Sequence, residues 1–383
     1  MIPADANGQV FVGEIVLPFL TLAVLIFSTG ARWRRNPALR HCLLALALTL
    51  AGYILADFIH HTKPQDYLRG WARIIVLGTN AFGLSLLGLE DEAFLWWYTL
   101  GLGLGSGATY LAMGTPFVLW KFSYALSASC IVLCLASFRY RFGAAVIMSL
   151  YGLVNFTMLD NRAFGGVSFL VAALLLVSMQ NRSKSHARHA LSLSRLMVAV
   201  AVAASVLFIA YETSQALYRT RRYVSNAIRW ANAEAALYSI LDSPIIGHGS
   251  WAFNVKMEIA FRFAYYAFTG QSPDPTGEGI DVLPHSQILS AWYEGGLFGV
   301  AFFMFYGYAL VRYGILYTLK RPYNYMTPLY LFISLLSMWH MIMSPFAGSQ
   351  RLGIAFTVAV LCRLCQEHQE SERALLPASR EAA

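Results

Sequence analysis

Long runs of apolar residues recur from end to end of the chain, separated by short polar turns. Most runs approach the roughly 20 residues that a helix needs to cross a bilayer. They are continuously apolar, whereas a membrane barrel strand alternates over about ten residues, so helices are predicted and a barrel is excluded. The predicted spans are 10–30, 42–61, 70–89, 94–113, 117–137, 142–159, 163–180, 195–214, 296–317, 327–345 and 352–367. The pattern predicts an all-α, polytopic transmembrane helical bundle of eleven or twelve spans.

One extended polar region, residues 216–283, interrupts this pattern. Within it, a helix-like run at 231–241 is followed by Pro244 and closely spaced glycines, which do not continue a helix. Residues 251–269 are rich in Phe and Tyr and carry several charges, a pattern typical of an amphipathic helix on a membrane surface. We therefore predict one large loop that contains short helices.

Composition agrees with a membrane location. Of the 383 residues, 57% are hydrophobic and 13% are charged, whereas a soluble domain carries about 25% charged residues. No soluble domain lies between the apolar runs, so residues 1–383 are predicted to form a single integral membrane domain.

Basic residues gather in the short loops after the first, fifth, seventh and ninth predicted spans. They are Arg32, Arg34, Arg35, Arg40, Arg139, Arg141, Arg182, Lys184, Arg188, Lys320 and Arg321. All four loops lie on one side if every span crosses once, and the positive-inside tendency makes that side the cytoplasm. The large loop is then external. The net charge of +8 is mostly this bias, so no nucleic-acid partner is expected.

Asp5 and Glu14 stand where a cleavable signal would carry basic residues, so the first segment is expected to remain as a helix. The five cysteines lie in apolar spans or near a cytoplasmic end, which implies no disulfide framework. Cys362 and Cys365 form a CxxC pair, but no second pair or nearby histidines accompany it, so packing is favoured over zinc or redox chemistry.

Three residues that suit phosphate binding and proton transfer are expected at the external face. Arg162 lies in a short turn before a span, Arg229 lies in the large loop, and His285 lies at the end of that loop. The arginine fork binds phosphate oxygens through two hydrogen bonds and keeps its charge, so two arginines suit a diphosphate. An imidazole with an ordinary pKa of about 6.5 accepts a proton at neutral pH. Together they fit transfer from an activated, diphosphate-linked donor.

Each residue also has a structural interpretation. Arg162 fits an arginine that snorkels from a helix end, and His285 fits a capping or hydrogen-bonded histidine. Glu294, nine residues after His285, would orient the imidazole only if the segment kinks. His248, between two glycines in a turn, favours structure over catalysis. The glycines that follow Glu294 are sufficiently explained by close helix packing.

Three blocks in order carry a resemblance to a known family: LDNRAFGG, then IRWANAEAALYSILDSPIIGHGSWAFN, then PHSQILSAWYEGGLFG before an apolar span. Over about residues 159–303 the chain resembles the O-antigen ligase and O-antigen polymerase superfamily of bacterial inner-membrane glycosyltransferases. In that family one arginine opens a helix, a second precedes a "P..G.G" turn in the large periplasmic loop, and a histidine closes the loop. Arg162, Arg229 and His285 occupy these positions. Family members commonly have one more span than the eleven counted here.

The resemblance implies transfer of a glycan from an undecaprenyl diphosphate carrier to an acceptor sugar hydroxyl at the periplasmic face of the inner membrane. Arg162 and Arg229 would hold the diphosphate and stabilise its departing charge. His285 would take or orient the hydroxyl proton, with inversion at the anomeric carbon. No metal or other cofactor is expected, because arginines supply the positive charge, and Asp274, Glu278 and Asp281 are spread through a turn-rich segment.

Five further residues are candidates for substrate binding: Arg219, Arg222, Glu294, Trp230 and Trp292. Among the loop arginines, Arg229 is preferred for its place relative to Pro244 and Gly247. The tryptophans suit stacking on sugars or anchoring at the bilayer surface.

A ligase is favoured over a polymerase because there is one large external loop and no second loop of comparable length. The two differ in acceptor, which is a lipid A-core oligosaccharide for a ligase and another lipid-linked repeat for a polymerase. A lipid-linked glycan transporter is the alternative from another class. Transporters usually carry charges at the bilayer midplane, whereas Glu14, Asp57, Lys121 and Arg312 lie near predicted span ends.

Overall fold

The computed structural model confirms the all-α prediction, because every regular element in the part of the chain that it describes is a helix. The described residues are 16–22, 32–117, 120, 123–137, 140–159, 161–180, 221–252, 255–272, 284–346 and 350–375. The predicted span 195–214, most of the span 10–30, and the acidic positions Asp274, Glu278 and Asp281 lie outside them.

The chain divides into two units. Unit 1 comprises residues 1–90, 216–310 and 337–383, and unit 2 comprises residues 91–215 and 311–336. Unit 1 contains α2 (Arg32–Arg35), α3 (Pro37–Ile59), α4 (Pro64–Glu90), α10 (Arg221–Asp242), α11 (Val255–Thr269), α12 (Gln287–Gly299), α13 (Ala301–Ala309) and α16 (Arg351–Leu375). Unit 2 contains α5 (Glu92–Ala112), α6 (Tyr124–Ser137), α7 (Arg141–Thr157), α8 (Arg162–Gln180) and α14 (Thr318–Lys320). Two further helices, η2 (Leu310–Tyr317) and α15 (Thr327–Met343), contain a boundary between the units or adjoin one. The prediction of one membrane domain over the whole chain stays a prediction.

Two helices, α3 and α4, are long and apolar enough to cross a membrane. A third candidate is the pair Gln287–Gly299 and Ala301–Lys320, which is bent by 108°. Shorter apolar helices occupy Tyr124–Ser137, Arg141–Phe156, Arg162–Ser178 and Thr327–Met343. Apolar helices therefore stand at most of the predicted span positions, and two or three of those described meet the length and composition of a span. The larger count of spans stays a prediction.

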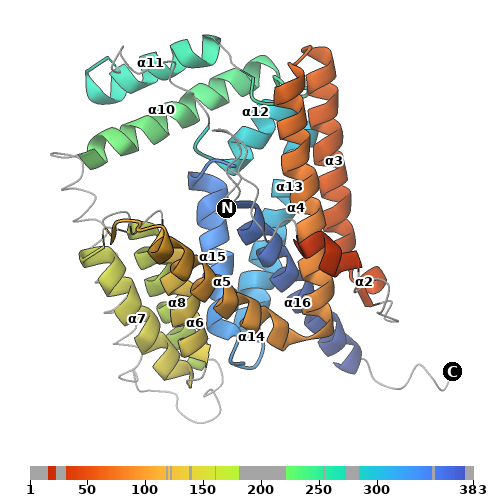
Figure 1. Cartoon of the computed structure of the whole chain (residues 1–383), viewed down its shortest axis with the longest axis vertical. Helices are drawn as coiled ribbons and strands as arrows, with labels where there is room; N and C mark the ends of the chain where they lie inside the picture. The colour runs from red at the N-terminus through yellow and green to blue at the C-terminus, as the bar shows by residue number, and fades with distance from the viewer. Residues whose placement is uncertain are drawn as a thin grey trace. The chain divides into compact units, whose positions relative to one another are not determined.

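In unit 1, α3 and α4 form a helical hairpin that Figure 1 shows side by side. α3 begins at Pro37 because Asn36 caps it: the Asn36 Oδ1 accepts from the Leu39 backbone N–H at 3.0 Å. The Asn36 amide also donates to the Cys362 carbonyl oxygen of α16 at 2.8 Å. A polar cap thus joins the start of α3 to the C-terminal helix.

Small residues let α12 approach α3 closely. A Cβ atom added to Gly52 would lie 2.7 Å from both the Gly295 carbonyl oxygen and the Gly299 nitrogen. Gly295 in turn lies against the Tyr53 ring, whose Cδ2 would be 2.6 Å from an added Cβ. The expected packing role of the glycines after Glu294 is therefore what the structure shows for Gly295 and Gly299.

In unit 2, α7 and α8 also pack through glycines, since a Cβ on Gly152 would lie 3.1 Å from the Gly165 carbonyl oxygen. The turn between them is fixed by Asn161, whose N–H donates to the Asn155 carbonyl oxygen at 2.9 Å. The Asn161 carbonyl oxygen accepts from the Gly165 N–H at 3.0 Å in the first turn of α8. This turn places Arg162 at the start of α8.

All five cysteines are buried free thiols, as the sequence predicted. Cys362 lies in α16 with its sulfur 3.7 Å from the Ser85 hydroxyl of α4. The described residues contain no group of three or more His, Cys, Asp or Glu side chains that would hold a metal ion.

Candidate active site

The two helices of the predicted loop pack on each other through an alanine face. One face of α10 packs in a buried cluster with Phe261 and Met257 of α11 through Ala227, Ala231 and Ala235. Tyr293 of α12 belongs to the same cluster, with Leu289 and Trp292 packed against it. In Figure 1, α10 and α11 run across the direction of α3 and α4. The loop helices are thus fastened to α12, the helix that follows His285.

The turn after α10 is held on α12 by backbone hydrogen bonds. The His248 N–H donates to the Tyr293 carbonyl oxygen at 2.8 Å, and the Gly249 N–H donates to the Glu294 carbonyl oxygen at 2.9 Å. The Leu297 N–H donates back to the Ile245 carbonyl oxygen at 3.1 Å. These hydrogen bonds join the turn to the backbone of α12 near its break. The helix breaks there because Gly296 has φ 62° and ψ −155°, outside the helical region.

Glycine is required in this turn for two reasons. Gly247 has φ 83° and Gly249 has φ 92°, in the region that favours residues without a Cβ. A Cβ on Gly247 would lie 2.5 Å from the Gly296 nitrogen and 2.6 Å from the Glu294 carbonyl oxygen. His248 between them is structural, as expected, since its Nε2 lies 2.8 Å from the Ser239 carbonyl oxygen.

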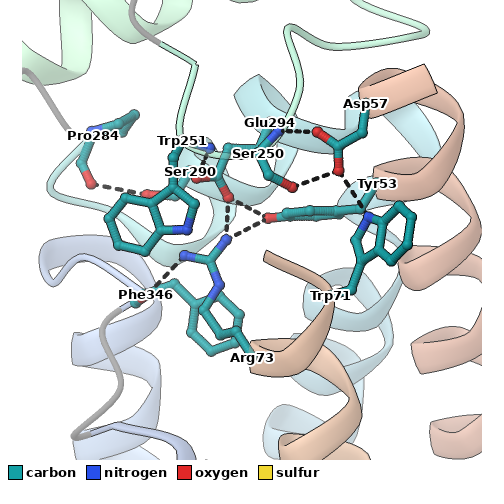
Figure 2. A network of polar contacts seen from close by, with 10 residues as sticks. All are labelled: Tyr53, Asp57, Trp71, Arg73, Ser250, Trp251, Pro284, Ser290, Glu294 and Phe346. Atoms are coloured by element: carbon teal, nitrogen blue, oxygen red, sulfur yellow. Dashed lines mark hydrogen bonds and ion pairs between the residues drawn. The ribbon is translucent and has the colours of Figure 1, made fainter. Parts of the chain in front are cut away.

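Beneath the turn, Arg73 of α4 and Glu294 of α12 form a buried ion pair (Figure 2). Both side chains are at most 5% exposed. The Tyr53 hydroxyl donates to the Glu294 Oε2 at 2.6 Å, and Arg73 also donates to the Phe346 carbonyl oxygen at 3.1 Å. The Trp251 N–H donates to the second carboxylate oxygen of Glu294 at 3.3 Å. Five segments of the chain therefore meet on one ion pair.

Aromatic faces complete the surroundings of Arg73. Its guanidinium carbon lies 4.6 Å from the ring centre of Phe346 and 5.3 Å from that of Trp251, in the range of cation–π interaction. Trp251 has φ 54°, uncommon for a bulky residue. Its backbone is held there by the hydrogen bond to Glu294.

A second buried carboxylate, Asp57 of α3, holds the same turn (Figure 2). Its Oδ1 accepts from the Ser250 N–H at 2.6 Å, and its Oδ2 accepts from the Ser250 hydroxyl at 2.7 Å and from the Trp71 indole N–H at 2.8 Å. Asp57 is only 3% exposed, and these three donors compensate its burial. We call Tyr53, Asp57, Arg73, Ser250 and Glu294 the anchor network.

His285 lies just before α12, beside a well-fixed helix start. The next residue, Ser286, caps α12 by accepting from the Leu289 N–H at 3.4 Å. The Ser290 hydroxyl donates to the Pro284 carbonyl oxygen at 2.9 Å, a contact also visible in Figure 2. The backbone on both sides of His285 is therefore tied to the first turn of the helix.

The His285 ring meets α10. Its Nδ1 lies 3.0 Å from the Nδ2 of Asn232, a residue that is only 3% exposed. Arg229 lies three residues earlier on the same helix, where side chains are neighbours on the helix surface. The structure thus brings His285 to Asn232, about one helical turn from Arg229.

Arg229 is half-buried, and burial lowers the pKa of its guanidinium. None of the ion pairs among the described residues includes it. A partly desolvated guanidinium with no carboxylate among the described residues is suited to an anionic ligand.

The other predicted site residues lie as follows. Arg162 opens α8 in unit 2, whereas Arg229 and His285 lie in unit 1, so their convergence on one diphosphate stays a prediction. Arg219 lies outside the described residues, and Arg222 lies in the first turn of α10. Trp230 is exposed on α10, and the Trp292 indole N–H donates to the Pro244 carbonyl oxygen at 2.8 Å.

Glu294 does not contact His285 in the structure, because its carboxylate points into the anchor network. The kink that would have brought the two together is absent, since the helix breaks at Gly296, after Glu294. Asn232 contacts the imidazole instead. The predicted substrate-binding role of Glu294 is untested, and its geometry is that of an anchor.

Sequence reasoning missed Asn232, Tyr53, Arg73 and Ser250. A signal existed for Arg73, because a charged residue inside a predicted span usually has a partner of opposite charge. Asn232 gave no comparable signal, since one asparagine in a helical run has many ordinary explanations.

These features define a helical protein whose apolar helices suit a membrane and whose polar site is built on α10 and the start of α12. Residues 144–304 match the family model described as O-antigen ligase. The match contains Arg162, Arg229 and His285, and it confirms the resemblance to the O-antigen ligase superfamily. That family is one of enzymes, and it supports a glycosyltransferase-like role in O-antigen assembly. No curated protein matches the chain.

Proposed function

We propose that this chain is an O-antigen ligase, which moves a glycan from an undecaprenyl diphosphate carrier to a sugar hydroxyl of lipid A-core. The family match supports the reaction class. The observation that carries the chemistry is the contact of α10 with the residues just before α12, where His285 meets Asn232 about one helical turn from Arg229. The site is a bacterial inner-membrane site that faces the periplasm.

Arg229 binds the donor diphosphate in this proposal. It is half-buried with no carboxylate partner among the described residues, and its planar fork matches phosphate oxygens. Arg162 is the second diphosphate ligand, and Arg222 and Arg219 add positive charge near the loop. Trp230, which is exposed, suits stacking on a sugar.

The transfer step balances without a metal ion. The acceptor oxygen attacks the anomeric carbon of the donor sugar while its proton passes to a ring nitrogen of His285. The bond between that carbon and the diphosphate oxygen breaks, and the electron pair leaves with the diphosphate. Attack opposite the leaving group inverts the anomeric carbon. The arginines stabilise the charge that develops on the diphosphate.

Replacement of His285 by Ala tests this proposal. The full-length protein is reconstituted with undecaprenyl diphosphate-linked O-antigen glycan and lipid A-core in the same vesicles. Loss of a general base is expected to slow transfer by about 10²- to 10⁴-fold. His248→Ala is the control, since that imidazole contacts only structural groups among the described residues. Unchanged transfer by a folded His285→Ala variant would remove this residue from the reaction.

The acceptor separates a ligase from an O-antigen or exopolysaccharide polymerase. A cell that lacks this protein should retain carrier-linked polymer and attach none to lipid A-core if the protein is a ligase. Lipid A-core capped by single repeats would identify a polymerase. A transporter would move the lipid-linked glycan across the vesicle membrane without forming a new glycosidic bond.

A further inference from the structure

The contact between Asn232 and His285 occupies one nitrogen of the imidazole ring. The Asn232 Nδ2 lies 3.0 Å from the His285 Nδ1, so Nδ1 is the nitrogen that meets α10. Any proton exchanged with a substrate then passes through Nε2. Because Asn232 is 3% exposed and sits on a helix packed against α11 and α12, it forms a rigid support for the ring.

The side-chain amide of Asn232 also has a carbonyl oxygen, Oδ1, that can accept a hydrogen bond. The Asn232 Oδ1 is buried and has no hydrogen-bond partner among the described residues. An amide has its donor nitrogen and its acceptor oxygen on the same carbon, so rotation of the Asn232 amide by about 180° places its Oδ1 next to the His285 Nδ1. In that orientation a protonated Nδ1 donates to Oδ1, and the lone pair of the neutral ring resides on Nε2.

We propose that Asn232 is the positioning residue of His285, holding Nδ1–H through its Oδ1 so that Nε2 takes the acceptor proton. This inference rests on the proposed glycosyltransferase function and extends it. When Nε2 accepts the proton from the acceptor hydroxyl, the resulting imidazolium keeps its Nδ1–H bond to the amide. No other group has to change its protonation state.

An amide differs from a carboxylate in this position. A neutral Oδ1 orients the ring without adding negative charge beside it. A carboxylate at the same point would favour the imidazolium and raise its pKa. Asparagine therefore suits a histidine that must be neutral at the start of each cycle.

Two variants separate orientation from charge. Asn232→Leu fills similar space with no hydrogen-bonding group and should lower kcat on the order of 100-fold with little change in KM, because the base is no longer aimed. Asn232→Asp keeps the shape and adds charge, so the acidic limb of the pH–rate profile should move up by about one unit. Ser239→Ala, buried on the same helix, is the control and should match the wild type.

A second readout does not need activity. Diethyl pyrocarbonate acylates only neutral imidazole, so the pH dependence of His285 modification, followed by peptide mass spectrometry, reports the ring directly. The charged groups and the histidine on the surrounding elements are Arg221, Arg222, Arg229, Glu234 and Asp242 on α10, Lys256, Glu258 and Arg262 on α11, Glu294 on α12 paired with Arg73 of α4, and His340 on α15. All are retained in each variant, so the shift between variants isolates position 232.

The outcomes are distinguishable. If His285→Ala is inactive while Asn232→Leu and Asn232→Asp keep the wild-type kcat and modification midpoint, the positioning role is wrong and the proposed function stands. If His285→Ala remains active, the proposed function fails, and a raised midpoint in Asn232→Asp still supports the contact. Should Asn232→Leu fail to fold, the nearly isosteric Asn232→Asp decides alone, and an unmoved midpoint overturns the inference.

Discussion

Two polar regions of unit 1 differ in how completely their groups are engaged. In the anchor network, the carboxylates of Asp57 and Glu294 each accept three hydrogen bonds, and Arg73 is ion-paired and flanked by aromatic rings. Around Asn232, the amide has an idle oxygen, and Arg229 has no carboxylate partner among the described residues. Both regions attach to the same short helix, α12. Among the described residues the Arg73 Nε has no hydrogen-bond partner, so the contrast rests on the two carboxylates and on the ion pair. Buried carboxylates that accept three hydrogen bonds hold a fold, whereas a guanidinium without a carboxylate partner is available to a ligand.

The largest effect should follow from opening the anchor network. Arg73→Ala leaves the Glu294 carboxylate buried without its cation, and breaking such a pair costs about 3–5 kcal/mol of unfolding free energy. Titration of the detergent-solubilised protein with SDS, followed by circular dichroism, measures it. Arg262→Ala removes an arginine from a more exposed pair with Glu258 and is the control, with an expected cost below about 1 kcal/mol. Equal stability of the two variants would show that the anchor network does not hold the fold.

A smaller loss of stability is expected from Gly247→Ala. The residue has φ 83°, and its new Cβ would lie 2.5 Å from the Gly296 nitrogen, so strain of about 1–3 kcal/mol is expected in the unfolding free energy. Gly270→Ala is a matched control, because Gly270 has φ 69° and open space around it. The difference between the variants measures the close contact with α12. A loss no larger than that of Gly270→Ala would mean that the turn adjusts freely.

Arg229→Lys should affect activity and leave the fold unchanged. Lysine keeps the charge but not the fork, so transfer is expected to fall by about tenfold or more while the SDS titration stays at the wild-type midpoint. Transfer in reconstituted vesicles is the measurement, with Arg262→Lys as the control. Wild-type transfer by Arg229→Lys would show that another arginine holds the diphosphate.

The smallest effect is expected from the exposed pair of Lys256 and Asp242, which are 2.7 Å apart. The hydrogen bond to Lys256 lowers the pKa of Asp242, so any stabilisation is present above the ordinary aspartate pKa and is lost as pH falls through the lowered value. Solvent screens such pairs, and Lys256→Gln should leave the SDS midpoint unchanged at neutral pH. A clear destabilisation at neutral pH would show that this exposed pair also holds the fold, as the anchor network is expected to do.

Much of the fold followed from apolar periodicity. The starts of α7 and α8 lie within one residue of the predicted boundaries at 142 and 163, because apolar runs and polar turns mark helix ends directly. The predicted span 296–317 starts a few residues too early, since the chain bends by 108° after Gly299 and the apolar helix runs over Ala301–Lys320. The glycines after Glu294 were interpreted as helix-packing residues. The helix break at Gly296 was not predicted, because it accompanies a hydrogen bond from the Leu297 N–H to the distant Ile245 carbonyl oxygen.

The site was predictable where residue chemistry is specific. His285 and Arg229 could be proposed from the sequence because an imidazole and a guanidinium in a polar loop suit proton transfer and phosphate binding, and their roles stay predictions. Asn232 and Arg73 were missed because their roles exist only through partners 53 and 221 positions away. Pairings at such separation leave no trace in local periodicity.

The anchor network limits how residues 144–304 can be exchanged with the matching segment of another protein. Glu294 and Ser250 lie inside the stretch that matches the O-antigen ligase family, whereas Tyr53, Asp57 and Arg73 lie outside it. A chimera that received only residues 144–304 would bury Glu294 opposite whatever its host carries in the first two long helices. Exchange of acceptor specificity by domain grafting should therefore succeed only when those three residues travel with the graft.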